Sequence, residues 1–305
     1  MYVLYSRHFI IFNIEKVYIL KITIITPACN EEASLPDLIN SVTNQTMLPT
    51  EWIIIDDGSV DSTSDVIKKA SSIFSWIKYL RKEKKDVRSP GRSVMETFYF
   101  GHRFLKTKNY DFIFKIDADL VLPKNYIERV IGQFQSDKKI GICGGVCVVK
   151  NNQKYEIESV TNLDHVRGAI KCYRRKCFDE IGGLVKAMGW DTIDEHTARF
   201  KGWDVKIIPD LQIIHKRPTH SEFGVINASF RNGQMLHSIR MGIVLTLGNC
   251  IKLIFKKPYL IHSISMILGY VSCIITRKKF VVSNELGKFI RTYRFKSFMK
   301  RLFNS

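Results

Sequence analysis

The sequence of 305 residues predicts an α/β fold that is followed by a basic helical region. Two observations predict it. In the first two thirds of the chain, short apolar runs rich in β-branched residues each lead into a polar turn and then into apolar residues at helical spacing. In residues 226–305 this alternation gives way to long apolar segments interrupted by Lys and Arg. With 45% hydrophobic residues, the chain can bury a full core.

The first strand is predicted at residues 22–27, where five consecutive β-branched residues suit a buried position. Pro27 has no N–H group to donate to a ladder, so we expect the strand to end there. Four apolar residues at helical spacing then predict a helix: Leu35, Leu38, Ile39 and Val42. Asn30, Glu31 and Glu32 lie between the two elements. Ligands of open α/β sheets bind beyond the carboxyl ends of the strands, so this polar turn is a candidate site.

Two further units repeat this arrangement. Apolar runs at residues 52–55 and 112–116 predict strands, and helices are expected to begin near Asp61 to Thr63 and near Pro123. Acidic residues directly follow both strands: Asp56, Asp57, Asp117 and Asp119. We therefore expect one cleft lined with carboxylates, and such a cleft requires a cation.

Carboxylates at strand ends can also simply cap the next helix. For Asp37 and Asp61 we favour that role, because both lie where a helix begins. Asp117 and Asp119 share one turn, where two carboxylates repel each other unless a metal or a positive group lies between them. We therefore interpret Asp117 and Asp119 as binding residues.

Several segments resemble family 2 glycosyltransferases, which have the GT-A fold, a Rossmann-like mixed sheet flanked by helices. "ITIITPACNEEASLPDLINSVTNQT", "WIIIDDGSVDST" and "FIFKIDADLVLP" resemble the first half of that family. "RGAIKCYRRKCFDEIGGL" resembles its acceptor-side segment, and "GWDTIDEHTARFKGWDVKIIPDLQIIHKRPTH" resembles its catalytic segment and the strand after it. The resemblance covers residues 21–220, and the motifs occur in the order typical of the family.

The resemblance implies metal-dependent, inverting transfer of a sugar from a UDP- or GDP-sugar to a hydroxyl group of a lipid-linked or cell-surface glycan. It implies that Asp119 and His215 hold Mg²⁺ or Mn²⁺, although a lone histidine is more often structural. It places Asp117 close to the sugar or ribose. The other residues implied for the nucleotide sugar are Asp57 and Asp56 for the base, and Pro27, Ala28 and Glu31 for the nucleoside. Many members have an aromatic residue where Cys29 stands.

Four basic residues are candidates to add positive charge near the leaving diphosphate. Arg88 and Arg92 flank a Ser-Pro-Gly turn before the third strand, and Arg217 and His220 flank Pro218 and Thr219. Exposed arginines are also common as solvated surface charge, and for Arg88 and Arg92 this alternative stays open.

The resemblance also implies a carboxylate base about a dozen residues before a glycine. Counting back eleven residues from Gly202 gives Asp191. Asp194 is the alternative, because it lies one helical turn later. A third possibility is that both carboxylates only begin the helix that follows.

Composition sets outer limits. Seven scattered cysteines without a C-x-x-C pair argue against a disulfide framework and against a zinc site, and they fit a cytosolic compartment. Cys143, Cys147, Cys172 and Cys177 are expected to be reduced core thiols.

Residues 1–20 contain Arg7, Glu15 and Lys16 within an apolar stretch. This segment does not resemble a signal peptide or a membrane span, and we expect an extra strand or a docking helix.

The positive charge is concentrated at the C-terminal end. Residues 226–305 contain 14 Lys or Arg and one acid, Glu285, which gives +13 of the net charge of +18. Within them, residues 258–276 have no charged side chain but show an apolar stripe opposite a stripe of His, Ser, Gly and Thr. This pattern favours a helix that lies in a membrane interface or packs on the catalytic domain over a helix that spans the membrane.

The sequence therefore predicts an N-terminal extension (1–20), a GT-A domain (21–225) and a basic, apolar helical region (226–305) that attaches to an anionic membrane surface. The protein would reside in the cytoplasm, peripheral or monotopic at the inner face of the cell membrane. Two alternatives are a nucleotidyltransferase of similar fold and a basic nucleic-acid-binding protein. Acidic strand ends argue against nucleic acid as a partner, and "PACNEEAS" lacks the Gly-rich basic loop of a nucleotidyltransferase.

Overall fold

The computed structural model describes residues 2–5, 8–13, 16–83, 91–151, 154–158, 164–217, 224–254 and 259–303. Arg88 and His220, two candidates from the sequence, lie outside these residues. The chain divides into two compact units, one of Met1–Lys186 with Trp190–Pro218, and one of Ala187–Gly189 with Thr219–Ser305. The sequence had suggested a division after residue 225.

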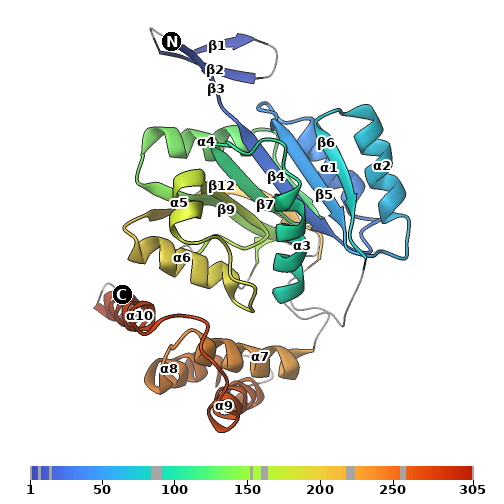
Figure 1. Ribbon diagram of the computed structural model, residues 1–305. Coiled ribbons are helices and arrows are strands. Elements are labelled where there is room, and N and C mark those ends of the chain that lie inside the picture. The colour runs from blue at the N-terminus through green and yellow to red at the C-terminus, as the bar shows by residue number, and fades with distance from the viewer. Residues whose placement is uncertain are drawn as a thin grey trace. The chain divides into compact units, whose positions relative to one another are not determined.

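The first unit is built on a mixed sheet of nine strands, in the order β6-β5-β4-β7-β11-β9-β12-β8, with β10 paired to β9 (Figure 1). Neighbouring strands run parallel from β6 to β7, and β9 is parallel to β12. The strand β11 is antiparallel to both of its neighbours, and β8 and β10 are antiparallel edge pairings. The strands are β4 (Ile22–Ala28), β5 (Glu51–Asp56), β6 (Ile77–Arg81), β7 (Phe112–Ile116), β8 (Leu120–Val121), β9 (Ile140–Asn151), β10 (Lys154–Ile157), β11 (Ile170–Arg174) and β12 (Asp204–His215).

The strand β4 does not end at Pro27 as the sequence suggested. Its pairing with β5 continues to Ala28, which lies opposite Asp56. Its pairing with β7 stops earlier, at Ile25 opposite Lys115. Because β4 is paired on one side only beyond Ile25, the missing N–H group of Pro27 is tolerated near the strand end.

Two layers of helices cover the two faces of this sheet. The helices α1, α2 and α4 contribute Leu38, Ile67 and Val130 to one hydrophobic cluster. The helices α3, α5 and α6 contribute Phe98, Phe178 and other residues to a second cluster on the opposite face. The predicted strand–helix alternation is confirmed, with helices at α1 (Leu35–Thr43), α2 (Thr63–Ile73), α3 (Arg92–Arg103), α4 (Tyr126–Ser136), α5 (Arg175–Glu180) and α6 (Trp190–Phe200).

Core thiols are found where the sequence predicted them. Cys143, Cys147, Cys172 and Cys177 are all buried. Burial raises the pKa of the Cys143 thiol to about 12, so this side chain stays protonated and behaves as a small apolar residue.

The N-terminal residues form neither a single added strand nor a helix. Three short strands, β1 (Tyr2–Tyr5), β2 (His8–Asn13) and β3 (Lys16–Ile19), pair with one another in an antiparallel sheet.

The second unit contains the helices α7 (Val225–Ser238), α8 (Ile243–Ile254), α9 (Leu260–Ile275) and α10 (Asn284–Phe303). Within the described part of the chain, we find no helix that combines the length and the apolar character needed to cross a membrane.

A close approach between β9 and β12 makes one glycine indispensable. The register of β12 shifts between Ile207 and Gln212, and a Cβ atom at Gly145 would lie 2.2 Å from the carbonyl oxygen of Leu211. We expect Gly145→Ala to lower the free energy of unfolding by about 1–3 kcal/mol, as overpacking usually does. Gly132→Ala in α4 is the control, because a Cβ atom there meets nothing within 4 Å and alanine favours a helix by about 1 kcal/mol. Urea unfolding compares the two variants, and equal stability would contradict this account.

Candidate active site

The sheet order brings the three acidic strand ends together. The strands β5, β4 and β7 are neighbours and run parallel, so their carboxyl ends lie at one edge. This edge, which we call the acidic edge, is formed by residues at or after the ends of these strands: Glu31, Asp56, Asp57, Asp117 and Asp119.

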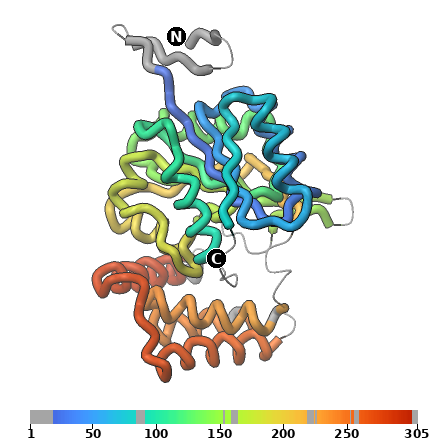
Figure 2. Tube along the Cα trace, turned by 45° about the vertical axis from the view of Figure 1, so that its right-hand side comes forward, coloured from blue at the N-terminus to red at the C-terminus, as the bar shows by residue number. Residues whose placement is uncertain are grey.

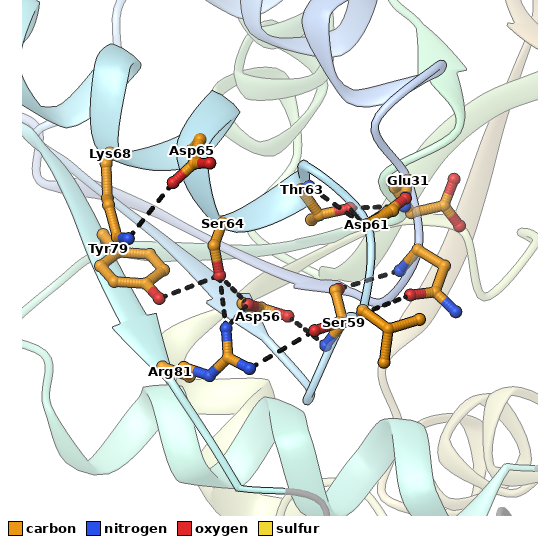
Figure 3. Close-up of polar contacts among 12 residues, drawn as sticks. Glu31, Asp56, Ser59, Asp61, Thr63, Ser64, Asp65, Lys68, Tyr79 and Arg81 are labelled. Atoms are coloured by element: carbon orange, nitrogen blue, oxygen red, sulfur yellow. Dashed lines mark hydrogen bonds and ion pairs between the residues drawn. The ribbon is translucent and has the colours of Figure 1, made fainter.

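Asp56 holds the turn after β5 in place (Figure 3). Its buried carboxylate accepts hydrogen bonds from the backbone N–H of Ser59 at 2.8 Å, from Arg81 at 3.0 Å and from the hydroxyl of Ser64. The neighbouring Asp57 is mostly buried and pairs with Lys82 at 2.8 Å. Both carboxylates of this turn are therefore neutralised by cations from β6 and the residue that follows it.

The turns after β4 and β5 bind each other. Asn30 adopts a left-handed backbone conformation, with φ of 56°, which asparagine tolerates better than most residues. Its backbone N–H donates to the hydroxyl of Ser59 at 2.9 Å, and its side-chain oxygen accepts from the N–H of Val60 at 3.0 Å. The N–H of Glu31 donates to the hydroxyl of Thr63 at 2.7 Å. These bonds fix the backbone that carries Glu31 into the acidic edge.

Neither aspartate is the helix cap that the sequence predicted, because the N-cap residue is Ser62 in α2 and Ser34 in α1. Asp61 lies one residue before the cap of α2 and accepts a hydrogen bond from the backbone N–H of Thr63 at 3.1 Å (Figure 3). Asp37 lies in the first turn of α1, and its carboxylate pairs with Lys216 at 2.5 Å.

Glu31 and Asp119 share one guanidinium. Arg217 lies 3.3 Å from Asp119 and forms an ion pair with Glu31. Burial, aided by the charges of Asp119 and Asp117, raises the pKa of Glu31 to about 7, against the opposing effect of Arg217. Asp117 in turn forms an ion pair with the buried Lys115. The carboxylates of the third strand end are thus close enough to raise the pKa of Glu31 at the first.

His215 lies beside Asp119 because β12 pairs with β8, which places His215 opposite Leu120. Its Nε2 is 3.4 Å from Asp119, and its Nδ1 is 3.2 Å from the buried Glu158. Arg167 lies 3.1 Å from the same oxygen of Glu158. Burial would lower the pKa of His215, but hydrogen bonds to Asp119 and Glu158 outweigh it and raise the pKa to about 9. Glu158 therefore orients the imidazole from the side opposite Asp119.

Asp119 and His215 can supply two ligands to a divalent metal. A carboxylate oxygen and an imidazole nitrogen together suit Mn²⁺ and related ions. Among the residues that the structure describes, no group of three or more His, Cys, Asp or Glu is arranged to hold an ion.

Two buried lysines lie next to each other on the face of the sheet that α6 covers. Lys115 on β7 is directly opposite Lys171 on β11. Both ammonium groups lie over the ring of Trp190, at 5.2 Å and 5.8 Å from its centroid. Like charges in this position repel, so they require carboxylate partners. Asp117 forms the ion pair with Lys115, and α6 supplies the partners of Lys171.

Asp194 is one of those partners. Its side chain is 1% exposed, and its two oxygens lie 2.8 Å and 3.0 Å from the ammonium of Lys171. It also accepts hydrogen bonds from the hydroxyl of Tyr173 and the backbone N–H of Glu195. These bonds occupy the carboxylate from several directions inside the protein.

Asp191 differs from Asp194 in exposure. Its side chain is 28% exposed and lies 3.5 Å from His165, whose other ring nitrogen is 3.2 Å from Glu195. Burial would raise the pKa of Asp191, but the hydrogen bond and charge of His165, together with Lys171, hold it well below the usual range. The pKa of His165 is raised to about 9 by the same two carboxylates, against the effect of burial. Asp191 is therefore ionised at neutral pH and open to solvent.

Three described candidates from the sequence remain to be placed: Pro27, Ala28 and Arg92. Pro27 and Ala28 are at the end of β4, next to Asp56. Arg92 begins α3 and pairs with Glu96 at 2.9 Å on the surface. Sequence reasoning missed the residues that support the site: Arg81, Lys82, Lys115, Glu158, His165, Arg167 and Lys171. A lysine inside each apolar strand, "FIFKI" and "IKCYR", was the available signal, because a buried charge must be paired.

Comparisons with known proteins agree with this fold. The mixed sheet and its acidic edge define a GT-A fold. A family model described as glycosyl transferase family 2 matches residues 23–184, more than half of the chain. The chain belongs to this family, as the sequence resemblance indicated.

Two curated relatives match part of the chain. Glycosyltransferase GlyA of Streptococcus pneumoniae serotype 4 is 26% identical over 124 residues, which cover 40% of this chain and 16% of GlyA. Undecaprenyl-phosphate 4-deoxy-4-formamido-L-arabinose transferase of Aeromonas hydrophila is 30% identical over 113 residues, covering 36% of this chain and 32% of that enzyme. The matches thus span less than a third of the length of either relative.

Solved structures resemble a larger part of the chain. Mannosyltransferase PcManGT from Pyrobaculum calidifontis, in complex with GDP-Man and Mn²⁺, has a TM-score of 0.54 at 13% identity, with 91% of this chain and 80% of that one covered. Residues 1–349 of TarS from S. aureus, in complex with UDP-GlcNAc, have a TM-score of 0.54 at 12% identity, with 84% and 73% covered. At this identity the likeness establishes the shared fold.

The pairing of Asp194 with Lys171 predicts a difference between the two candidate bases. We expect Asp194→Asn to lower the free energy of unfolding by about 3 kcal/mol, because removing one charge of a buried pair leaves the other poorly compensated. Asp191→Asn is the matched variant, and we expect a smaller loss, since its side chain is partly exposed and its partner His165 keeps Glu195 as a second carboxylate. Urea unfolding of both proteins measures the difference. A larger loss for Asp191→Asn would contradict a structural role for Asp194.

Proposed function

We propose that this protein is an inverting, metal-dependent glycosyltransferase that moves a sugar from a UDP- or GDP-sugar to a hydroxyl group of a lipid-linked or cell-surface glycan. One observation carries the proposal. Asp119 lies beside His215 and Arg217 at the acidic edge, while Asp191, on another element, is ionised and partly exposed. The first group suits a diphosphate leaving group, and the second suits the deprotonation of an acceptor.

The donor is proposed to bind at the carboxyl ends of β4, β5 and β7. Family membership and the nucleotide complexes of the structural neighbours support this placement. Asp56 is already bonded to Ser59, Ser64 and Arg81, so Asp57 is the better candidate to accept a hydrogen bond from the base. Pro27, Ala28 and Glu31 would contact the nucleoside, and Asp117 the sugar or ribose. Arg92 remains a candidate for the diphosphate.

Asp119 and His215 are proposed to hold Mg²⁺ or Mn²⁺ together with the donor diphosphate. A divalent ion bound there would supply positive charge to the diphosphate as the bond to the sugar breaks. Arg217, which lies between Glu31 and Asp119, adds positive charge at the same place. His215 must lose its extra proton to serve as a ligand, so metal binding would release a proton.

Asp191 is proposed as the general base, with Asp194 as the less favoured candidate because its oxygens are occupied. The acceptor oxygen attacks the anomeric carbon from the side opposite the diphosphate, and its proton passes to the Asp191 carboxylate. The bond between the anomeric carbon and the phosphate oxygen breaks as the new bond forms, and UDP or GDP leaves with the bonding electrons. A single displacement of this kind inverts the configuration of the sugar.

The acceptor and the location of the enzyme are also proposals. The Aeromonas hydrophila relative is named for an undecaprenyl-phosphate substrate, which supports a lipid-linked acceptor here. The concentration of basic residues in 226–305 suits attachment to the anionic inner face of the cell membrane. Such a protein would remain cytoplasmic and peripheral or monotopic, and act in synthesis of a cell-envelope polysaccharide.

The metal assignment predicts the behaviour of Asp119→Ala. This variant should lose transfer and also the metal-dependent part of donor binding, because one of two protein ligands is gone. Calorimetric titration of UDP- and GDP-sugars, with Mn²⁺ and with a chelator, measures both states. Asp65→Ala on the exposed surface of α2 is the control and should behave like the parent. If Asp119→Ala keeps its response to Mn²⁺, the assignment fails.

The base assignment predicts that Asp191→Asn binds the donor almost as well as the parent but loses transfer by about 10²–10⁴-fold, the usual contribution of general base catalysis. Asn keeps the size of the side chain but cannot accept a proton. Asp179→Asn, an exposed carboxylate on α5, is the control and should keep full activity. Release of UDP or GDP with a saturating acceptor measures the rate. Near-normal turnover by Asp191→Asn would exclude this residue as the base.

A further inference from the structure

The helices α7 and α9 of the second unit touch through their backbones. Figure 2 shows them side by side. A Cβ atom at Gly233 would lie 1.9 Å from the carbonyl oxygen of Met266, and one at Gly269 would lie 1.9 Å from that of Phe230. Glycine is therefore required at both crossing points, because any side chain would force the helices apart.

The buried side of α9 combines small residues with two larger ones. Ser265, Gly269 and Cys273 recur every four positions, and Met266 and Tyr270 are buried beside them. Between α8 and α9, the hydroxyl of Ser263 donates to the carbonyl of Cys250 at 2.7 Å. Close packing of small residues with hydrogen bonds between helices is typical of proteins in lipid, where aliphatic burial does not drive association.

The large aliphatic side chains of these helices point outward. Each is between 43% and 76% exposed: Ile243, Val244, Leu247 and Ile251 on α8, and Leu260, Ile261, Ile264, Leu268, Ile274 and Ile275 on α9. We call this set the aliphatic face. Sequence reasoning had identified an apolar stripe on α9, but the mostly small residues opposite it, not the stripe, form the buried side. Exposed apolar side chains in this number mark an interaction site.

Exposed basic residues follow the aliphatic face along the chain. Arg277, Lys278 and Lys279 come after the end of α9 at Ile275, with Thr276 between. On α10, exposed positive charges recur at Lys288, Arg291, Lys296 and Lys300, against the single acid Glu285. Long basic side chains beside apolar ones place their charges at the level of lipid headgroups. The charge thus identifies the occupant as an anionic bilayer rather than a second basic copy of this chain, which would be repelled.

We propose that the aliphatic face of α8 and α9 inserts into the interface of an anionic membrane, with the basic residues of α9 and α10 on the headgroups. The proposal deepens the membrane attachment proposed above and rests on it, but it does not depend on the transfer chemistry. Membrane binding then has two separable contributions. Apolar insertion is insensitive to salt, whereas the attraction between basic residues and headgroups is weakened by salt.

Sedimentation of the full chain with vesicles tests the proposal. The vesicles contain phosphatidylcholine with about one third phosphatidylglycerol, and binding is compared at about 0.1 M and about 1 M NaCl, where charges are screened over ~10 Å and ~3 Å. We expect Ile264→Asn/Leu268→Asn to weaken vesicle binding at high salt by at least about tenfold, because buried apolar area determines the binding that remains when charges are screened. The matched variant Lys288→Gln/Lys296→Gln should lose binding at low salt only.

Both double variants change exposed side chains, so thermal unfolding should show that each remains folded. Unchanged vesicle binding by the Ile264→Asn/Leu268→Asn variant at high salt overturns the proposal, as does a parent that binds no vesicles. A dimer detected by light scattering without lipid, and abolished by the same two substitutions, would instead assign the face to self-association. Vesicle binding without any release of UDP or GDP would leave this proposal intact and refute only the catalytic one.

Discussion

The burial of Lys115 and Lys171 side by side is the constraint on which the candidate site depends. The two lysines are register partners on antiparallel strands, and both are almost fully buried beneath Trp190. Neither charge is tolerable there alone, since a buried ion without a partner costs several kcal/mol (roughly 3–5). The turn after β7 and the first turns of α6 must therefore stay where their carboxylates reach the lysines. This requirement couples the position of the acidic edge to the position of α6.

The same constraint divides the carboxylates into two kinds. Asp117, Asp194 and Glu195 compensate the lysines, and Asp56 holds a turn, so each of these groups has a structural role. Asp119 pairs with His215 and Arg217, and Asp191 pairs with His165. Ion pairs with histidine are more readily rearranged than a fully buried lysine pair. The proposed chemistry therefore rests on Asp119 and Asp191, and each lies near a carboxylate that compensates a buried lysine.

The sequence predicted the elements better than the contacts between them. The strands at 52–55 and 112–116 were visible because β-branched and aromatic runs precede acidic turns, and the GT-A fold followed from motif order. The sequence left the choice between Asp191 and Asp194 open, because both lie on one helix. The pairing of β11 with β7 positions Lys171, and the ion pair of Lys171 with Asp194 distinguishes the two carboxylates. Likewise, the stripe on α9 was recognised, but its direction depends on where Gly233 and Gly269 permit α7 and α9 to meet.

The central claim is that the acidic edge is a site for a nucleoside diphosphate whose binding depends on a divalent metal. Titration of the unmodified protein with UDP and with GDP, each with Mn²⁺ and with a chelator, tests this most directly. The account predicts that one of the two nucleotides binds at least about tenfold more tightly with Mn²⁺, because a bound ion would add positive charge between Asp119 and the diphosphate. Equal affinity in the two conditions, or no binding of either nucleotide, would contradict it.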